Sequence, residues 1–152
     1  MKTKSSLQKI KQIISKYDSF ILYKPLSDEV DYNNLSFPLK FFSENIMLPS
    51  NKNSNPLLWA TKCISKYKNS NPCVLVPGTR FDIYGTRHGR GKGWYDRFLS
   101  KIPKKWFRVG ITHASKFSLF PISFQEWDEQ VDLVITHDGF HWMVYETSAR
   151  NK

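Results

Sequence analysis

The chain has 152 residues, the length of one ordinary domain, and its 40% hydrophobic and 15% aromatic content excludes an intrinsically disordered protein. Lys and Arg outnumber Asp and Glu by 23 to 13, and the net charge of +10 favours an anionic partner, either a nucleotide, a phosphate or a nucleic acid. The two cysteines lack metal-ligand spacing, which excludes structural zinc. The sequence shows no signal-peptide core and no apolar run long enough to cross a membrane, so we expect one cytoplasmic domain over residues 1–152.

The first third of the chain begins with a predicted helix. Apolar residues recur at helical spacing over residues 7–17, with lysines and glutamines between them. Residues 20–26 (FILYKPL) have the apolar composition of an extended segment. Residues 27–42 offer a second helix with early acids, which Pro38 would interrupt or restart.

The middle of the chain alternates strands and helices. Residues 45–49 predict a short buried strand, and the Asn- and Ser-rich residues 50–56 predict a loop. A helix is expected over residues 56–67. The continuous apolar run at 73–78 (CVLVPG) is typical of a central strand that is covered on both faces.

The last third continues this alternation. We expect a helix over 94–102, a strand over 107–113, a polar connection over 124–130, a buried strand over 131–139 and an edge strand over 141–147. Strands that alternate with helices indicate a Rossmann-like, three-layer α/β sandwich with a mostly parallel central sheet. Ligands are then expected at the carboxyl ends of the strands.

A glycine-rich segment follows the predicted central strand. Gly89, Gly91 and Gly93 alternate with Arg90 and Lys92 and lead into the predicted helix at Trp94. A backbone without Cβ atoms can turn its N–H groups toward an anion, and the start of a helix favours an anion at the same place. The pattern predicts a phosphate-binding loop, although its spacing matches neither the P-loop nor the dinucleotide motif, and a flexible turn in a basic protein is the alternative.

Charged side chains flank this loop. Asp96 falls in the first turn of the predicted helix, where a carboxylate either stabilises the helix dipole or helps to hold magnesium. Arg87 precedes the loop and is preferred to Arg97 as a phosphate ligand. Trp127 and the remaining tryptophans outside the loop are interpreted as core or rim packing, and Asp82 as a turn residue.

Three motifs occur in order: PGTRFD (77–82), YGTRHGRGKGWYDRFL (84–99) and WDEQVD (127–132). With these motifs the chain resembles the 5-formyltetrahydrofolate cyclo-ligase family, also called methenyltetrahydrofolate synthetase. The resemblance extends upstream through LYKPLSDEVDYNNL (22–35), which is similar to the family segment that carries a folate-facing glutamate, here Glu29.

The resemblance implies site residues and two ligands, MgATP and a reduced folate. It implies ATP binding by Arg87, His88, Gly89, Arg90, Gly91, Lys92, Gly93, Trp94 and Tyr95. It implies folate binding by Glu29, Arg90, Gly91, Lys92, Gly93 and Trp94, catalysis by Arg87, Arg90 and Lys92, and magnesium binding by Asp96 and Asp128.

The implied reaction converts 5-formyltetrahydrofolate to 5,10-methenyltetrahydrofolate, with release of ADP and phosphate, in a protein that we expect to be a monomer.

The chain departs from the family in its short N-terminal half, which lacks the usual Lys-x-x-x-Arg ATP anchor, so that Lys4, Lys9 or Lys11 are candidates to replace it. Trp94 also stands where the family usually has tyrosine. The alternatives are a basic nucleic-acid-binding domain, or an inactive relative that retains phosphate binding.

Overall fold

A six-stranded sheet lies at the centre of the molecule, in a computed structural model that describes residues 6–33, 37, 45–51, 53–91 and 93–147. In spatial order its strands are β2 (Ile46–Leu48), β1 (Phe20–Tyr23), β3 (Cys73–Pro77), β6 (Phe107–His113), β8 (Leu133–His137) and β9 (Trp142–Glu146). Neighbouring strands are parallel except for β8 and β9, which pair antiparallel at one edge. The predicted parallel sheet and edge strand are confirmed.

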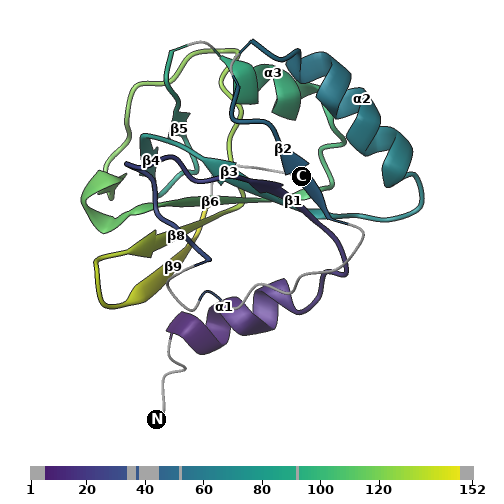
Figure 1. Ribbon diagram of the computed structural model, residues 1–152. Coiled ribbons are helices and arrows are strands. Elements are labelled where there is room, and N and C mark those ends of the chain that lie inside the picture. The colour runs from purple at the N-terminus through teal and green to yellow at the C-terminus, as the bar shows by residue number, and fades with distance from the viewer. Residues whose placement is uncertain (1–5, 34–36, 38–44, 52, 92, 148–152) are drawn as a thin grey trace.

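Helices cover the two faces of this sheet. Helix α1 (Ser6–Ile14) lies on one face, and α2 (Pro56–Lys66) and α3 (Trp94–Lys101) lie together on the other (Figure 1). The predicted three-layer α/β sandwich is confirmed, as are all three of these helices. No helix within the described part of the chain is long and apolar enough to cross a membrane.

Local sequence explains where these elements begin and end. Asn55 caps α2 by accepting hydrogen bonds from the backbone N–H groups of Leu57 and Leu58, and Pro56 supplies the fixed φ that suits a first helical position. All five residues of β3 are buried, as expected of a strand that has a neighbour on each side and a helical layer on each face.

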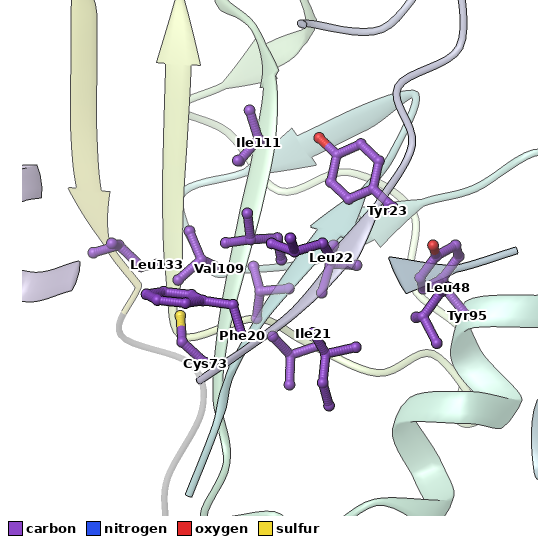
Figure 2. Close-up of a cluster of buried hydrophobic side chains, with 14 of the residues drawn as sticks. Phe20, Ile21, Leu22, Tyr23, Leu48, Cys73, Tyr95, Val109, Ile111 and Leu133 are labelled. Carbon is purple, nitrogen blue, oxygen red and sulfur yellow. The ribbon is translucent and has the colours of Figure 1, made fainter. Parts of the chain in front are cut away.

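The core gathers side chains from most strands. Figure 2 shows Phe20, Ile21 and Leu22 of β1 packed with residues from β2, β3, β6 and β8, all of them buried. Tyr95 joins this cluster from α3, so the helix that follows the glycine-rich loop is anchored in the core. A rigid core of this kind fixes the position of the loop at its edge.

Strand order explains the location of the site. After β1 the chain adds β2 on one side and then returns through α2 to place β3 on the other side, so the direction of winding changes between β1 and β3. In open α/β sheets, ligands bind outside the carboxyl ends of the strands at such a switch point. The segments after β1 and β3 carry Glu29 and the glycine-rich loop.

A second, three-stranded sheet was not predicted. It consists of β5 (Arg87–His88), β4 (Arg80–Asp82) and β7 (Phe117–Ser118), where β7 follows a short 3₁₀ helix at Ala114–Lys116. Buried Asp82 accepts backbone hydrogen bonds from Tyr84 and Thr86 through Oδ1 and from Ile122 through Oδ2, which confirms its role as a turn residue. Strands of two or three residues are too short to show a periodic pattern.

The helix expected over residues 27–42 is wrong in its described part. Residues 27–33 form turns, and the Glu29 backbone N–H donates to the carbonyl oxygen of Leu26. Val30 and Tyr32 are buried, and the Tyr32 hydroxyl donates to the backbone carbonyl of Tyr23, which holds the segment against β1. Residues 34–36 and 38–44, including Pro38, lie outside the described residues.

Candidate active site

A pocket of about 630 Å³ opens beside the glycine-rich loop. Its walls come from the loop itself, from α3 and from the segment before β8. They are formed by Arg87, His88, Gly89, Arg90, Gly91, Gly93, Trp94, Tyr95, Asp96, Arg97, Ser100, Trp127, Asp128 and Glu129. The structure thus gathers most of the predicted ATP and magnesium residues around one cavity, whose size is typical of small-molecule sites. Lys92 lies outside the described residues, and its assignment stays a prediction.

Arg87 is the buried cation of this pocket. Its side chain is 5% exposed, its Nε donates to the carbonyl oxygen of Pro77 at 2.6 Å, and its guanidinium lies 5.1 Å from the Tyr95 ring centre. Burial lowers the pKa of Arg87, and the nearby Asp96 opposes this shift. Because an arginine remains protonated under such conditions, the pocket contains a fixed positive charge.

The three alternating glycines have two separate physical roles. A Cβ at position 89 would lie 2.8 Å from Nη2 of Arg87, so Gly89 makes room for that guanidinium. Gly91 and Gly93 adopt φ values of +90° and +66°, which residues with a Cβ atom rarely adopt. Gly93 is also the N-cap of α3 and caps it without a side-chain hydrogen bond.

Asp96 and Asp128 both line the pocket. Asp96 Oδ1 accepts from the Glu129 backbone N–H at 3.1 Å and lies 3.9 Å from Nη1 of Arg87. Burial raises the pKa of Asp96. The hydrogen bond from the Glu129 N–H and the charge of Arg87 oppose this rise, and the negative charges of Asp128 and Glu129 add to it. The described residues contain no group of three potential metal-binding side chains. Carboxylate oxygens are ligands that Mg²⁺ accepts, and Asp96 and Asp128 are the two predicted metal ligands that line this pocket.

Glu29 lies next to the loop, in a neighbouring pocket of about 100 Å³ that Arg90 also lines. Its side chain is 10% exposed, and its Oε1 accepts from the Leu26 backbone N–H at 2.8 Å. Nη2 of Arg90 lies 2.7 Å from Asp28 and 3.5 Å from Glu29. Arg90 therefore stands between the two pockets, where a single side chain can contact a ligand in either.

The aromatic residues of the motif are held by the protein. The Trp94 indole N–H contacts both the carbonyl and the hydroxyl oxygen of Ser54, at 3.0 and 3.2 Å, and the ring stacks on Phe98. Tyr95 is buried beneath Arg87, and Nε2 of His88 lies 2.8 Å from the carbonyl oxygen of Ser123. These three side chains line the pocket, and each is held in place by contacts with other residues of the chain.

Sequence reasoning missed a buried arginine behind the site. Arg108 in β6 is 1% exposed; its Nη2 donates to the Leu99 carbonyl at 2.8 Å and its Nη1 lies 3.2 Å from Glu129. Asp132 accepts from the backbone N–H of Arg108 at 2.9 Å. Arg108 thus links Leu99 of α3 to Glu129, the residue after Asp128. No motif could have revealed these long-range contacts.

Three lysines were named as replacements for the family's N-terminal anchor, and of these Lys9 does not line the large pocket. Its Nζ lies 3.9 Å from Glu146 of β9, at the edge of the sheet that α1 covers. Lys11 is on the same helix, on the face of the sheet opposite to α2 and α3 (Figure 1). Lys4 lies outside the described residues.

Comparison with known proteins decides the family. The family described as the 5-formyltetrahydrofolate cyclo-ligase family matches residues 23–137, a span that includes Glu29, the glycine-rich loop and Asp128. The chain belongs to this family. The resemblance inferred from the three motifs is therefore confirmed, and with it the assignment to a family of ligases.

Individual relatives agree with this result. The chain is 27% identical over 119 residues to a 5-formyltetrahydrofolate cyclo-ligase of Mycoplasma pneumoniae, an alignment that covers 77% of this chain and 71% of the relative. It is 32% identical over 99 residues to a protein of the same name from Mycoplasma genitalium, covering 65% of this chain and 48% of the relative.

A solved structure agrees with the fold. The structure of 5,10-methenyltetrahydrofolate synthetase from Aquifex aeolicus aligns with a TM-score of 0.55 at 23% identity. The alignment covers 95% of this chain and 81% of that protein. At this identity the likeness supports the arrangement of the elements.

Proposed function

We propose that this chain catalyses the ATP-dependent conversion of 5-formyltetrahydrofolate to 5,10-methenyltetrahydrofolate, with release of ADP and phosphate. Membership of the cyclo-ligase family supports this activity. The observation that carries the assignment to a site is the position of Arg87, whose buried guanidinium lies against Gly89 and 3.9 Å from Asp96 in the large pocket. A buried cation beside a bare loop and two carboxylates fits a triphosphate and its metal.

The pocket supplies positive charge on several sides. Arg87 provides a fixed charge in the wall, Arg90 lines both this pocket and the neighbouring one, and Arg97 follows on α3. The N-terminus of α3, which begins at Trp94 beside the loop, adds the positive end of the helix dipole. Asp96 and Asp128 would hold Mg²⁺, which neutralises phosphate charge when bound. Phosphoryl transfer depends on such positioning and neutralisation more than on a protein nucleophile.

The proposed reaction has two steps. The formyl oxygen of the folate attacks the terminal phosphorus of ATP, a P–O bond to ADP breaks, and the formyl oxygen becomes a phosphate ester. N10 of the folate then attacks the formyl carbon and loses its proton, and the C–O bond breaks so that phosphate leaves with the former formyl oxygen. Arg87 and Arg90 stabilise the negative charge on the transferred group.

We assign the folate to the side of the loop where Glu29 lies. Glu29 and Arg90 line the smaller pocket at the carboxyl ends of β1 and β3, next to the larger one. A carboxylate that accepts hydrogen bonds suits the N–H groups of a pterin, and a nearby cation suits the formyl oxygen. This arrangement would place the formyl group near the glycine-rich loop.

We also propose that the chain acts as a monomer in the cytoplasm. A single chain supplies both pockets, which supports a monomeric site. Cys63 and Cys73 are buried and form no disulfide, as is usual in a reducing compartment.

An absorbance assay tests the activity. Purified protein is mixed with MgATP and 5-formyltetrahydrofolate, and the absorbance of methenyltetrahydrofolate is followed. We expect product from the native chain and none from a Lys92→Ala, Asp96→Ala double variant. If the native chain binds MgATP and forms no product, the proposed activity is wrong and the chain is an inactive relative that retains phosphate binding.

A further inference from the structure

Trp127 is an exposed aromatic residue on the wall of the large pocket. Its side chain is 69% exposed, although it lines the same cavity as Arg87 and Asp96. Trp106 and Trp142 behave as expected of packing residues, with exposures of 1% and 6%. Leaving a large indole in water forfeits apolar burial, so its place in a ligand pocket requires an explanation.

The backbone around Trp127 is fixed on both sides. Asp128 closes a turn by donating its backbone N–H to the Gln125 carbonyl at 3.0 Å, and its Oδ2 accepts from the Gln125 N–H at 2.8 Å. The next residue, Glu129, donates its N–H to Asp96 on α3 at 3.1 Å. The indole is therefore presented from an anchored turn.

The pocket extends well beyond the phosphate-binding loop. Along α3 it is lined from Gly93 to Ser100, a distance of about 10 Å at the rise of an α-helix. Arg97 and Ser100 line this outer part, and Trp127 is the exposed aromatic side chain among the lining residues. A nucleotide whose phosphates contact the loop would have its ribose and base in this region.

On these observations, and resting on the function proposed above, we propose that Trp127 is the stacking platform for the purine ring of the bound nucleoside triphosphate. Its indole face contacts the planar base while Asp128, the adjacent residue, lies near the phosphates. Stacking on an aromatic side chain contributes affinity without hydrogen-bond readout, so this contact tolerates different purines.

A pterin is the other planar heteroaromatic ring in this reaction. The purine is favoured because Trp127 lines the pocket that contains Arg87, Gly89 and the two aspartates. Glu29 lines a different, adjacent pocket, where the pterin is assigned. Trp127 is absent from that second pocket, among the residues that the structure describes.

Titration calorimetry with three ligands tests the proposal. The ligands are MgATP, magnesium tripolyphosphate, which has phosphates and no base, and 5-formyltetrahydrofolate. The proteins are the native chain, Trp127→Ala and Trp127→Phe, with Phe120→Ala as a matched control. Phe120 is 78% exposed and, like Trp127, lies in the segment between β7 and β8, but it does not line the large pocket.

We expect Trp127→Ala to weaken MgATP binding about tenfold, Trp127→Phe to retain most of the affinity, and Phe120→Ala to bind like the native chain. Tripolyphosphate and 5-formyltetrahydrofolate should bind all four proteins equally. Equal losses for MgATP and tripolyphosphate, an unchanged MgATP affinity, or a loss confined to the folate would each overturn the purine assignment. Failure of the native chain to bind tripolyphosphate would instead contradict the phosphate site of the proposed function, and the stacking role with it.

Discussion

The guanidinium of Arg87 lies 3.9 Å from the carboxylate of Asp96, and both side chains are largely shielded from water. Arg87 reaches this position from the small sheet, held by the carbonyl of Pro77 at the end of β3. Asp96 reaches it from the first turn of α3. The pair connects three elements that the sequence separates, at the carboxyl edge of the central sheet.

Replacing Arg87 tests the importance of this pair. In Arg87→Met the Pro77 carbonyl loses a charged donor, and the pKa of Asp96 rises further because Arg87 no longer opposes the effect of burial. We expect the free energy of unfolding to fall by about 1–3 kcal/mol, as measured by urea denaturation, and product formation to be lost. Native-like activity in a folded variant would show that the buried charge has no role in the reaction.

Gly91 and Gly139 form a matched pair for testing the loop. Both have strongly positive φ, +90° and +102°, and a Cβ at either position would meet no atom within 4 Å. Alanine should strain the backbone at each, with a loss of about 1–2 kcal/mol of stability. Gly139 lies in the turn between β8 and β9, so we expect only Gly91→Ala to weaken MgATP binding in calorimetry. Equal affinities in the two variants would contradict a phosphate-binding role for the loop.

The Tyr23 hydroxyl predicts a stabilising substitution. Tyr23 is 3% exposed, and its hydroxyl has no hydrogen-bond partner among the described residues. Since a buried polar group without a partner costs free energy, Tyr23→Phe should raise the free energy of unfolding by about 1 kcal/mol in urea titrations. The matched variant Tyr32→Phe loses a donor to the Tyr23 carbonyl and should lower it. Destabilisation by Tyr23→Phe would mean that the hydroxyl is satisfied in solution.

His137 predicts a pH dependence of stability. Its Nδ1 accepts from the Gly139 N–H at 3.1 Å, which requires a neutral ring, and burial lowers its pKa below 6.5. Because the folded pKa lies below the unfolded one, this contribution is fully present above about pH 6.5 and is lost as the pH falls. The free energy of unfolding should fall from pH 7 to pH 5 less steeply in His137→Gln than in the native chain. Identical slopes would show that His137 titrates as it does in the unfolded chain.

Local patterns predicted the parts of the fold that depend on local physics. The apolar runs at Cys73–Pro77 and Phe107–His113 form neighbouring central strands, and Asn55 and Pro56 mark the start of α2 as side-chain chemistry requires. A helix was wrongly expected over residues 27–33 because acidic residues early in this segment are typical of a helix start. In the structure the segment forms turns instead, and Val30 and Tyr32 are buried.

The candidate site was predictable only in part. Glycine spacing and family motifs identified the loop and its flanking charges. The burial of Arg108, the bonds from Trp94 to Ser54 and the exposure of Trp127 depend on segments that meet only in the folded chain. A single sequence has no local signal for such contacts.

The most direct test of the central claim follows an oxygen atom. The native chain is incubated with MgATP and 5-formyltetrahydrofolate that is labelled with heavy oxygen in the formyl group, and the released phosphate is examined by mass spectrometry. If the formyl oxygen is phosphorylated and then leaves with phosphate, each phosphate formed with product carries one labelled oxygen. Methenyltetrahydrofolate formed together with unlabelled phosphate would contradict the proposed phosphoryl transfer.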